Sequence, residues 1–219
     1  MTSAALRRAI IFAGGELGEW AAALIQPNDY IIGADRGALY LAESGLPLHL
    51  AVGDFDSIDP QQLAYVRQHA GEMLAFDAVD KDWTDSELAL REALARGWRD
   101  VVIVGGLGSR FDHTLANVYL LCLAADEGCS AVLVGEHNEI RLLTGPGECR
   151  LDADPRFEHV SLLPIAGEAA GITLSGFVYP LNDATLRMGM TLGVSNKLAG
   201  TEGIVELGEG RLLLIRSRD

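Results

Sequence analysis

Strand-like and helix-like segments alternate along the first two thirds of the chain, and this alternation constrains the fold more than any other feature. Six short apolar runs are typical of buried strands: 9–12, 30–34, 50–52, 73–76, 101–104 and 131–134. Between them, apolar residues recur at helical spacing in 17–24, 37–44, 60–69, 86–96 and 114–127. The alternation predicts an α/β fold with a doubly wound, mainly parallel, Rossmann-like sheet.

The pattern changes near Gly145-Pro146-Gly147. Beyond this point the apolar runs are short, as in 160–163, 171–174 and 212–215, and turn residues separate them. Several short strands with frequent turns predict a small all-β sandwich or partial barrel. We therefore expect two domains, 1–144 and 145–219.

Two carboxylates stand two residues apart directly after the apolar run 50–52, in the segment Gly53-Asp54-Phe55-Asp56-Ser57. In an extended backbone, residues i and i+2 point the same way, so Asp54 and Asp56 can face one cation. Mg2+ typically binds one or two protein carboxylates and completes its shell with phosphate and water. The alternative is an acidic turn exposed to solvent.

Two later loops have a similar character. The acidic cluster 80–85 opens a helical pattern, where Asp82 and Asp85 could also serve only to cap the helix. The glycine-rich segment 105–113 connects a strand to a helix, and such a turn presents backbone N–H groups and a positive dipole end to phosphate. Arg110 adds a guanidinium that can bind phosphate oxygens, although the glycines alone could simply form a turn.

All these loops follow predicted strands and precede predicted helices. In a parallel sheet, such loops lie together at the carboxyl ends of the strands, where ligands bind. The turns that contain Gly14-Gly15 and Asp35-Arg36-Gly37 belong to the same edge. Asp35 also suits a helix-capping role.

The composition narrows the functional classes. The 219 residues are 49% hydrophobic, and Lys+Arg 17 against Asp+Glu 31 gives a net charge of −14, which argues against nucleic acid as a partner. No apolar run is long enough for a membrane span, and the run 9–13 after Arg7-Arg8 is too short for a signal peptide. The three cysteines form no CxxC pair, so we expect neither a zinc site nor disulfides. We expect a cytoplasmic location.

Five segments together resemble the thiamine pyrophosphokinase family: GADRGA at 33–38, GDFDS at 53–57, DKDWTD at 80–85, GGLGSRFDH at 105–113 and GVSN at 193–196. The resemblance extends over most of the chain. It implies an α/β catalytic domain that binds ATP and Mg2+, followed by a β-rich domain that binds thiamine. It also implies a homodimer whose active sites form between the subunits.

The reaction implied by the resemblance is attack of the thiamine hydroxyl on the β-phosphorus of ATP, with AMP leaving. Positioning and charge neutralisation supply most of the catalysis in such a transfer. The metal ligands implied are Asp54, Asp56 and Asp82, and Asp85 and Asp112 join them in the catalytic set. The residues implied to bind ATP are Asp35, Arg36, Lys81, Arg110, His113 and Asn117; we expect His113 to hydrogen-bond or start the helix rather than act as an acid or base.

The thiamine-binding residues implied by the resemblance are Tyr179, Ser195 and Asn196. In the family, an aromatic residue at the position of Tyr179 stacks on the pyrimidine ring from the partner subunit. Thiamine carries a cationic ring and two flat faces, for which an aromatic side chain is a suitable receptor. The alternative for Tyr179 is a place in the core of the small domain.

Two features depart from the simplest expectation. Arg36 replaces the first glycine of the family's usual ADGGA segment, and we expect it to contact phosphate instead. The chain has no GxxxxGKS loop, so metal, arginine and lysine must hold the phosphates. The alternatives are a related pyrophosphokinase acting on a pterin alcohol and a module that binds Mg2+-nucleotide without turnover.

Overall fold

The computed structural model describes residues 8–76 and 83–219 of the 219-residue chain. It divides into two compact units, Met1–Glu136 and His137–Asp219. The boundary expected from the sequence, at Gly145-Pro146-Gly147, falls between two strands of the second unit. No helix among the described residues has the length and apolar character needed to cross a membrane.

The first unit contains six parallel strands in the order β4-β3-β2-β1-β5-β6. Their bounds are β1 Ala9–Phe12, β2 Tyr30–Ala34, β3 Leu50–Gly53, β4 Glu72–Ala75, β5 Asp100–Val104 and β6 Ser130–Val134. All four residues of β1 are buried, as expected for a central strand covered on both faces. The doubly wound parallel sheet predicted from the sequence is confirmed.

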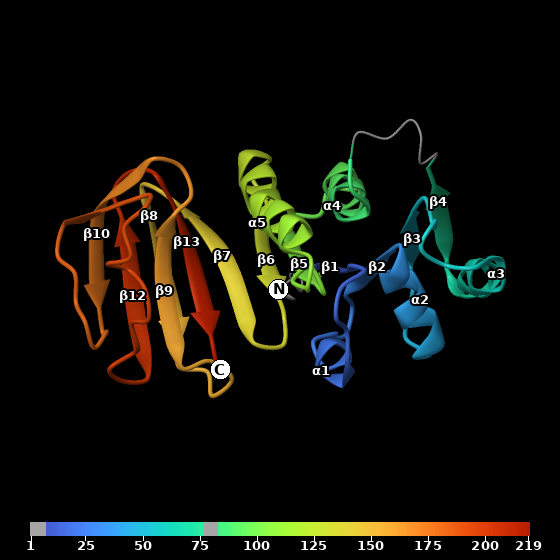
Figure 1. The fold of residues 1–219 in the computed structure, drawn as a ribbon, viewed down its shortest axis with the longest axis horizontal. Coiled ribbons are helices and arrows are strands. Elements are labelled where there is room, and N and C mark those ends of the chain that lie inside the picture. Colours follow the sequence, from blue (N-terminus) through green and yellow to red (C-terminus); the bar gives the residue numbers. More distant parts are fainter. Residues whose placement is uncertain (1–7, 77–82) are drawn as a thin grey trace, which may run out of the picture. The chain divides into compact units, whose positions relative to one another are not determined.

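Five helices connect these strands: α1 Glu19–Ala22, α2 Arg36–Glu43, α3 Pro60–His69, α4 Asp85–Ala95 and α5 Phe111–Asp126. Helices α4 and α5 lie on one side of the sheet, and α1 and α2 lie on the other (Figure 1). Helix α3 packs beside α2, and a capping box between Asp59 and Gln62 begins it.

The chain changes direction at β1. It runs outward from β1 through β2 and β3 to β4, and α4 then crosses β3, β2 and β1 to reach β5 on the other side of β1. The pair β1–β5 is therefore the topological switch point of the sheet, the usual place for ligands in such folds. The glycine-containing loops 14–15 and 105–108 follow these two strands.

The second unit consists of seven antiparallel strands. They are β7 Asn138–Thr144, β8 Gly147–Asp152, β9 His159–Pro164, β10 Glu168–Ser175, β11 Ala184–Arg187, β12 Glu202–Leu207 and β13 Arg211–Ser217. Strands β7-β13-β9 are neighbours in that order, and β11-β10-β12-β8 form a second sheet. Buried Leu162 and Leu214 of the first set share a core with Ile172 and Val205 of the second, which gives the predicted sandwich.

Candidate active site

The loop after β3 places its two carboxylates by a turn rather than by an extended backbone. Phe55 has φ 58° and its side chain is 4% exposed, so it turns inward between Asp54 and Asp56. The Asp56 N–H donates to Asp54 Oδ1 at 3.1 Å. The extended geometry predicted from the sequence is wrong here, because Phe55 adopts the left-handed backbone conformation and is buried between the two carboxylates in the chain.

Asp35, at the end of β2, carries unusual local geometry. Its φ of 48° and ψ of −115° are strained for a residue with a Cβ, and its side chain makes no capping hydrogen bond to α2. Instead, Ser57 Oγ donates to Asp35 Oδ2. Among the described residues, none hydrogen-bonds to the buried Asp35 Oδ1. Burial raises the pKa of Asp35, the charges of Asp85 and Asp54 raise it further, and the Ser57 hydrogen bond opposes the shift.

These side chains converge at the carboxyl end of the sheet. One oxygen each of Asp35, Asp54 and Asp56 lie within 4.8 Å of one another. Asp85, the first residue of α4, is close by: a Cβ at Gly53 would lie 3.2 Å from its Oδ1 and 3.3 Å from the backbone nitrogen of Asp35. Lys81 and Asp82, also expected in this site, lie outside the described residues.

The turn at Arg36-Gly37 explains why arginine can replace glycine there. Arg36 is exposed, whereas a Cβ at Gly37 would lie 1.9 Å from the carbonyl oxygen of Phe12 in β1. The close approach between the start of α2 and β1 thus occurs at Gly37, the second glycine of the ADGGA segment, which is still glycine in this sequence. Arg36 projects its side chain without disturbing that contact.

Two side chains of α5 support the glycine-rich loop after β5. Asn117 is buried and its Nδ2 donates to the carbonyl of Gly106 at 2.8 Å. Thr114 Oγ1 accepts from the Gly108 N–H at 3.1 Å. Asn117 therefore holds the loop from beneath. Neither supporting role follows from sequence alone, although Thr114 directly follows the motif 105–113 and Asn117 lies about one helical turn beyond it.

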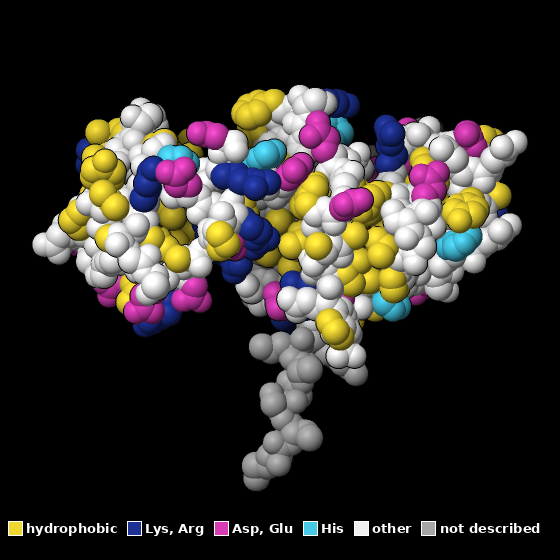
Figure 2. Space-filling model, turned by 90° about the horizontal axis from the view of Figure 1, so that it is seen from below, with side chains coloured by type: hydrophobic (Ala, Val, Ile, Leu, Met, Phe, Trp, Pro, Cys, Tyr) yellow, Lys and Arg dark blue, Asp and Glu magenta, His cyan; other side chains and the backbone are white. Residues whose placement is uncertain are grey.

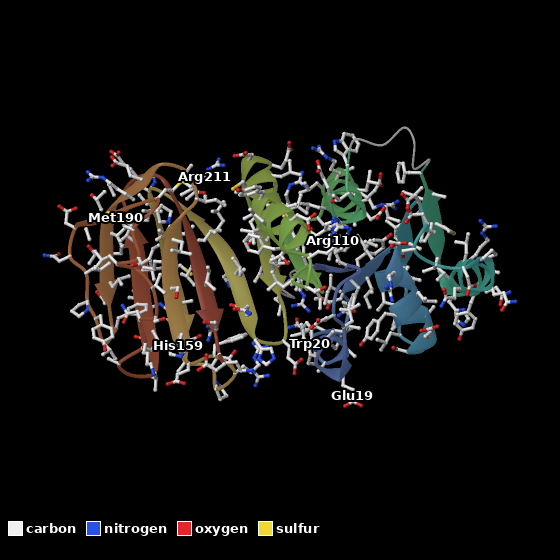
Figure 3. The ribbon with its side chains drawn as sticks, viewed as in Figure 1. Glu19, Trp20, Arg110, His159, Met190 and Arg211 are labelled. Carbon is white, nitrogen blue, oxygen red and sulfur yellow. The ribbon has the colours of Figure 1, made fainter. Side chains whose placement is uncertain are left out.

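Arg110 and Asp112 pair with each other at the start of α5. Their side chains are exposed and the shortest N–O distance is 2.6 Å. The hydrogen bond from Arg110 lowers the pKa of Asp112, so this carboxyl stays ionised. Figure 3 labels Arg110 where α5 begins. His113, the next residue, is also exposed.

A cavity of about 410 Å³ opens at the switch point of the first unit. Its lining combines glycine backbone, apolar side chains and charged side chains: Gly14, Gly15, Glu16, Leu17, Arg36, Leu39, Tyr40, Glu43, Gly108 and Ser109. Arg36, which lines the cavity, directly follows Asp35 of the acidic cluster in the sequence. The volume suits a small organic ligand.

The second unit exposes apolar side chains near its predicted thiamine-binding residues. Tyr179 is 65% exposed and so is not a core residue. Other large apolar side chains that this unit exposes are Val178, Met188, Met190, Leu192 and Val194. Figure 3 labels Met190, which belongs to the long connection between β11 and β12.

Ser195 and Asn196 differ in their surroundings. Ser195 is exposed, has φ 60°, and its backbone N–H donates to Ser161 Oγ at 3.0 Å. Asn196 is 7% exposed, and its amide bonds to both backbone polar groups of Tyr179. The structure thus joins Asn196 to Tyr179 directly.

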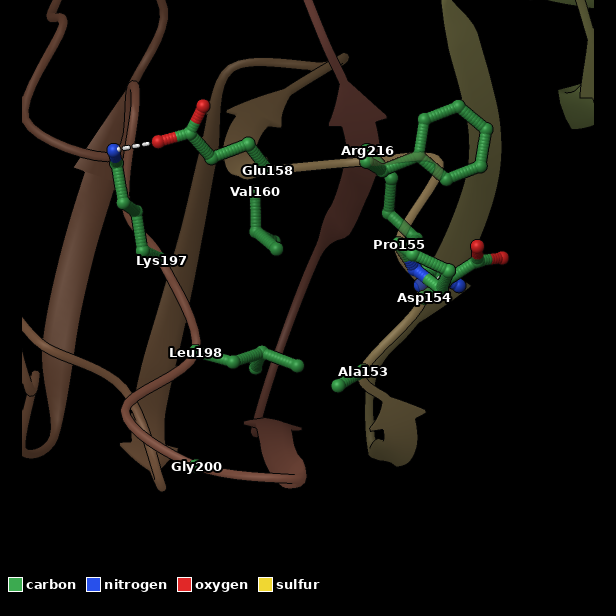
Figure 4. Close-up of a pocket in the computed structure, with 10 residues that line it drawn as sticks. Ala153, Asp154, Pro155, Glu158, Val160, Lys197, Leu198, Gly200 and Arg216 are labelled. Atoms are coloured by element: carbon green, nitrogen blue, oxygen red, sulfur yellow. Dashed lines mark hydrogen bonds and ion pairs between the residues drawn. The ribbon is translucent and has the colours of Figure 1, made fainter.

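A second cavity of about 410 Å³ lies in the same unit, and residues of the segment that follows Asn196 line part of it. Lys197 and Glu158 form an ion pair at its edge, and Val160 and Leu198 line its apolar part (Figure 4). Arg216 lines the far side and donates to the carbonyl of Asp152 at 3.0 Å. Acidic and basic side chains are likewise interspersed over the face seen in Figure 2.

Ser57 is a residue of this site that the sequence did not single out. Its position in the segment 53–57 was the available signal, but its partner Asp35 is remote in sequence. The loops after β2 and β3 meet because these two strands are neighbours in the sheet, and the sequence pattern did not define which strands are neighbours.

Comparisons with known proteins agree across both units. Residues 21–133 match the family model "Thiamin pyrophosphokinase, catalytic domain", and residues 148–212 match "Thiamin pyrophosphokinase, vitamin B1 binding domain". Thiamine pyrophosphokinase of Bacillus subtilis is 35% identical over 188 residues, which cover 86% of this chain and 87% of that protein.

Solved structures show the same relationship. The crystal structure of the Bacillus subtilis enzyme aligns with a TM-score of 0.89 and 31% identity, covering 97% of this chain and 100% of that one. The structure from Geobacillus thermodenitrificans aligns with a TM-score of 0.86 and 32% identity, covering 97% of this chain and 98% of that one. With both domain models matched and most of its length aligned, the chain belongs to the thiamine pyrophosphokinase family.

Proposed function

We propose that the carboxylate cluster at the ends of β2 and β3 holds the Mg2+-triphosphate of ATP while the thiamine hydroxyl attacks its β-phosphorus. Family membership identifies the activity, which is pyrophosphoryl transfer from ATP to thiamine with release of AMP. The convergence of Asp35, Asp54 and Asp56 within 4.8 Å is the observation that carries the proposal for the site. The comparisons add no support for a pterin substrate or for a module without turnover.

The donor set suits Mg2+. Carboxylate oxygens are hard ligands of the kind this ion prefers, and Asp35 Oδ1 is buried without a hydrogen-bond partner among the described residues. Asp35, Asp54 and Asp56 would therefore be ligands, with Asp85 next to them. Bound Mg2+ would supply charge neutralisation for the phosphates. Asp35 was expected to contact ATP; we now assign it to the metal.

The remaining groups orient the phosphates and stabilise their charge. The first turn of α5 presents the positive end of the helix dipole, which favours an anion. Arg110 can bind phosphate while Asp112 holds its guanidinium in place. In the transfer, the β-phosphorus forms a bond to the thiamine oxygen and breaks its bond to the α–β bridging oxygen, which leaves with AMP, while the hydroxyl proton is released to water.

The cavity at the switch point would hold the nucleoside of ATP. Leu17, Leu39 and Tyr40 offer apolar contacts to a base, and Glu16 and Glu43 offer acceptors. A Cβ at Gly14 would contact only the Arg36 side chain, at 3.6 Å, so a larger residue there would extend into the cavity. Gly14→Leu should raise KM for ATP and leave KM for thiamine unchanged; equal effects on both would place the nucleoside elsewhere.

Thiamine would bind against Tyr179 and Ser195, both exposed in the second unit. We also propose a homodimer in which this surface completes the site of the partner subunit. Exposed apolar side chains of this unit, from Val194 at 43% exposure to Leu192 at 65%, would be protected from water where that partner covers them. Light scattering should give the mass of a dimer; a monomer with full turnover would contradict the shared site.

The activity is tested with ATP and Mg2+, with and without thiamine, by measuring AMP release. We expect release only when thiamine is present, and we expect excess chelator to stop it. Silence with thiamine and AMP release with a pterin alcohol would contradict the assignment. At a limiting thiamine concentration, mixing Asp54→Asn subunits with Tyr179→Ala subunits should give more AMP release than either variant alone if each site uses both chains, whereas no gain would contradict the shared site.

A further inference from the structure

The side chain of Asn196 is engaged by the protein's own backbone. Its Oδ1 accepts from the Tyr179 N–H at 3.1 Å and from the Lys197 N–H at 2.8 Å, and its Nδ2 donates to the Tyr179 carbonyl at 2.7 Å. A carbonyl oxygen has two acceptor positions, and both are occupied here. Burial of the residue, at 7% exposure, separates the amide further from an incoming ligand.

This amide continues a backbone ladder. The Val178 N–H donates to the Lys197 carbonyl at 2.9 Å, and Phe177 forms an antiparallel bridge with Leu198. The Asn196 side chain adds one more pair of hydrogen bonds to that ladder, at Tyr179. Tyr179 thus has both of its backbone polar groups bound while its ring remains 65% exposed.

Asn196 is itself fixed to the core of the sandwich. Its N–H and carbonyl exchange hydrogen bonds with Val160 of β9, at 2.9 and 2.8 Å, and Val160 is buried. A continuous set of hydrogen bonds therefore leads from β9 through Asn196 to the backbone that carries the Tyr179 ring. The backbone that carries the ring would lose little further freedom when a ligand stacks on the ring.

We infer that Asn196 is a positioning residue that acts on thiamine through Tyr179 rather than by contact. The inference rests on the proposed function, in which Tyr179 receives thiamine. It replaces the expectation that Asn196 binds thiamine directly. Ser195, whose side chain is exposed, keeps the role of a direct contact.

A double-mutant cycle tests this inference with the full-length protein. Wild type, Asn196→Ala, Tyr179→Ala and the double variant are compared by KM for thiamine, KM for ATP and calorimetric thiamine binding. We expect Asn196→Ala to raise KM and Kd for thiamine about tenfold, equivalent to about 1.4 kcal/mol. In the Tyr179→Ala background the same substitution should add less than about twofold, because no ring remains to be positioned.

Ser195→Ala is the matched control. Because Ser195 is proposed to contact thiamine directly, loss of its hydroxyl should weaken thiamine binding by the same factor with or without the Tyr179 ring. Asn196→Asp keeps the acceptor and loses the Nδ2 donor, so it provides a second variant if Asn196→Ala folds poorly; its effect should also disappear without Tyr179. Equal effects of either Asn196 substitution in both backgrounds would overturn the inference. Wild type without thiamine-dependent AMP release would overturn the proposed function instead.

Discussion

Ser57 Oγ donates a hydrogen bond to Asp35 Oδ2 and thereby joins the loop after β3 to the end of β2. The bond occupies one carboxylate oxygen of Asp35. The other oxygen, Oδ1, is buried and has no hydrogen-bond partner among the described residues, and one oxygen of Asp35 lies within 4.8 Å of oxygens of Asp54 and Asp56. The orientation of Asp35 within the proposed metal site thus depends on a side chain from a different loop.

Ser57→Ala should weaken metal binding, because Asp35 would lose the contact that orients it. We expect the half-saturating Mg2+ concentration to rise several-fold, and calorimetry with Mn2+ and nucleotide should show the same loss of affinity. Ser57→Thr keeps a hydroxyl and should retain most of the affinity. Unchanged metal affinity in Ser57→Ala would contradict this role.

Asp54→Asn should reduce the rate of AMP release by orders of magnitude, because the cluster loses one negative charge that would attract and bind the metal ion. Its melting temperature should stay near that of wild type, since Asp54 is a loop residue. Asp152→Asn removes one charge from an exposed site of β8 and serves as the control. A variant at position 54 with near wild-type turnover would remove this residue from the metal site.

Gly37→Ala should destabilise the first unit, because the new Cβ would lie 1.9 Å from the Phe12 carbonyl oxygen and the backbone must move. We expect a loss of about 1–3 kcal/mol in urea unfolding. Gly14→Ala is a matched control in the neighbouring turn, where the nearest atom to the added Cβ is 3.6 Å away. Equal stability of the two variants would show that α2 packs less closely against β1.

Asp154 should make the stability of the second unit depend on pH. A hydrogen bond from Arg156 lowers the pKa of Asp154 below its usual range, and the pair is 2.7 Å apart. Its contribution is therefore fully present above the unfolded pKa, near pH 4, and is lost as the pH falls through the folded value.

Asp154→Asn should cost about 1 kcal/mol at neutral pH, and the difference from wild type should shrink below about pH 4. Urea unfolding at several pH values provides the measurement. Arg156→Met should reduce the same pH dependence, and the Arg156 backbone N–H and the charge of Arg216 should preserve the remainder. A difference that stays constant from pH 7 to pH 3 would show that charge pairing at Asp154 does not contribute.

The parallel sheet could be predicted because its strands are continuous apolar runs. The runs 9–12 and 30–34 coincide with β1 and β2, and the periodicity of the segment 60–69 coincides with α3. Strands β7, β8, β11 and β12 were not predicted. In β8, exposed Glu148 and Arg150 alternate with partly buried residues, so its strand character comes from pairing with β12 rather than from a local apolar run.

The candidate site could be predicted only where its chemistry is local in sequence. Asp54 and Asp56 stood out because two carboxylates follow a buried strand. The inward turn at Phe55 and the bond between Ser57 and Asp35 arise from tertiary packing. The same is true of Asn196, whose side-chain partner lies 17 residues away and which a motif alone suggests as a ligand contact.

Product stoichiometry tests the central claim most directly. The purified chain would be incubated with ATP, Mg2+ and thiamine, and AMP, ADP and thiamine diphosphate would be quantified by mass spectrometry. Pyrophosphoryl transfer predicts equal amounts of AMP and thiamine diphosphate, with both products lost in Asp54→Asn. Accumulation of ADP and thiamine monophosphate, or AMP release that does not depend on thiamine, would contradict the account.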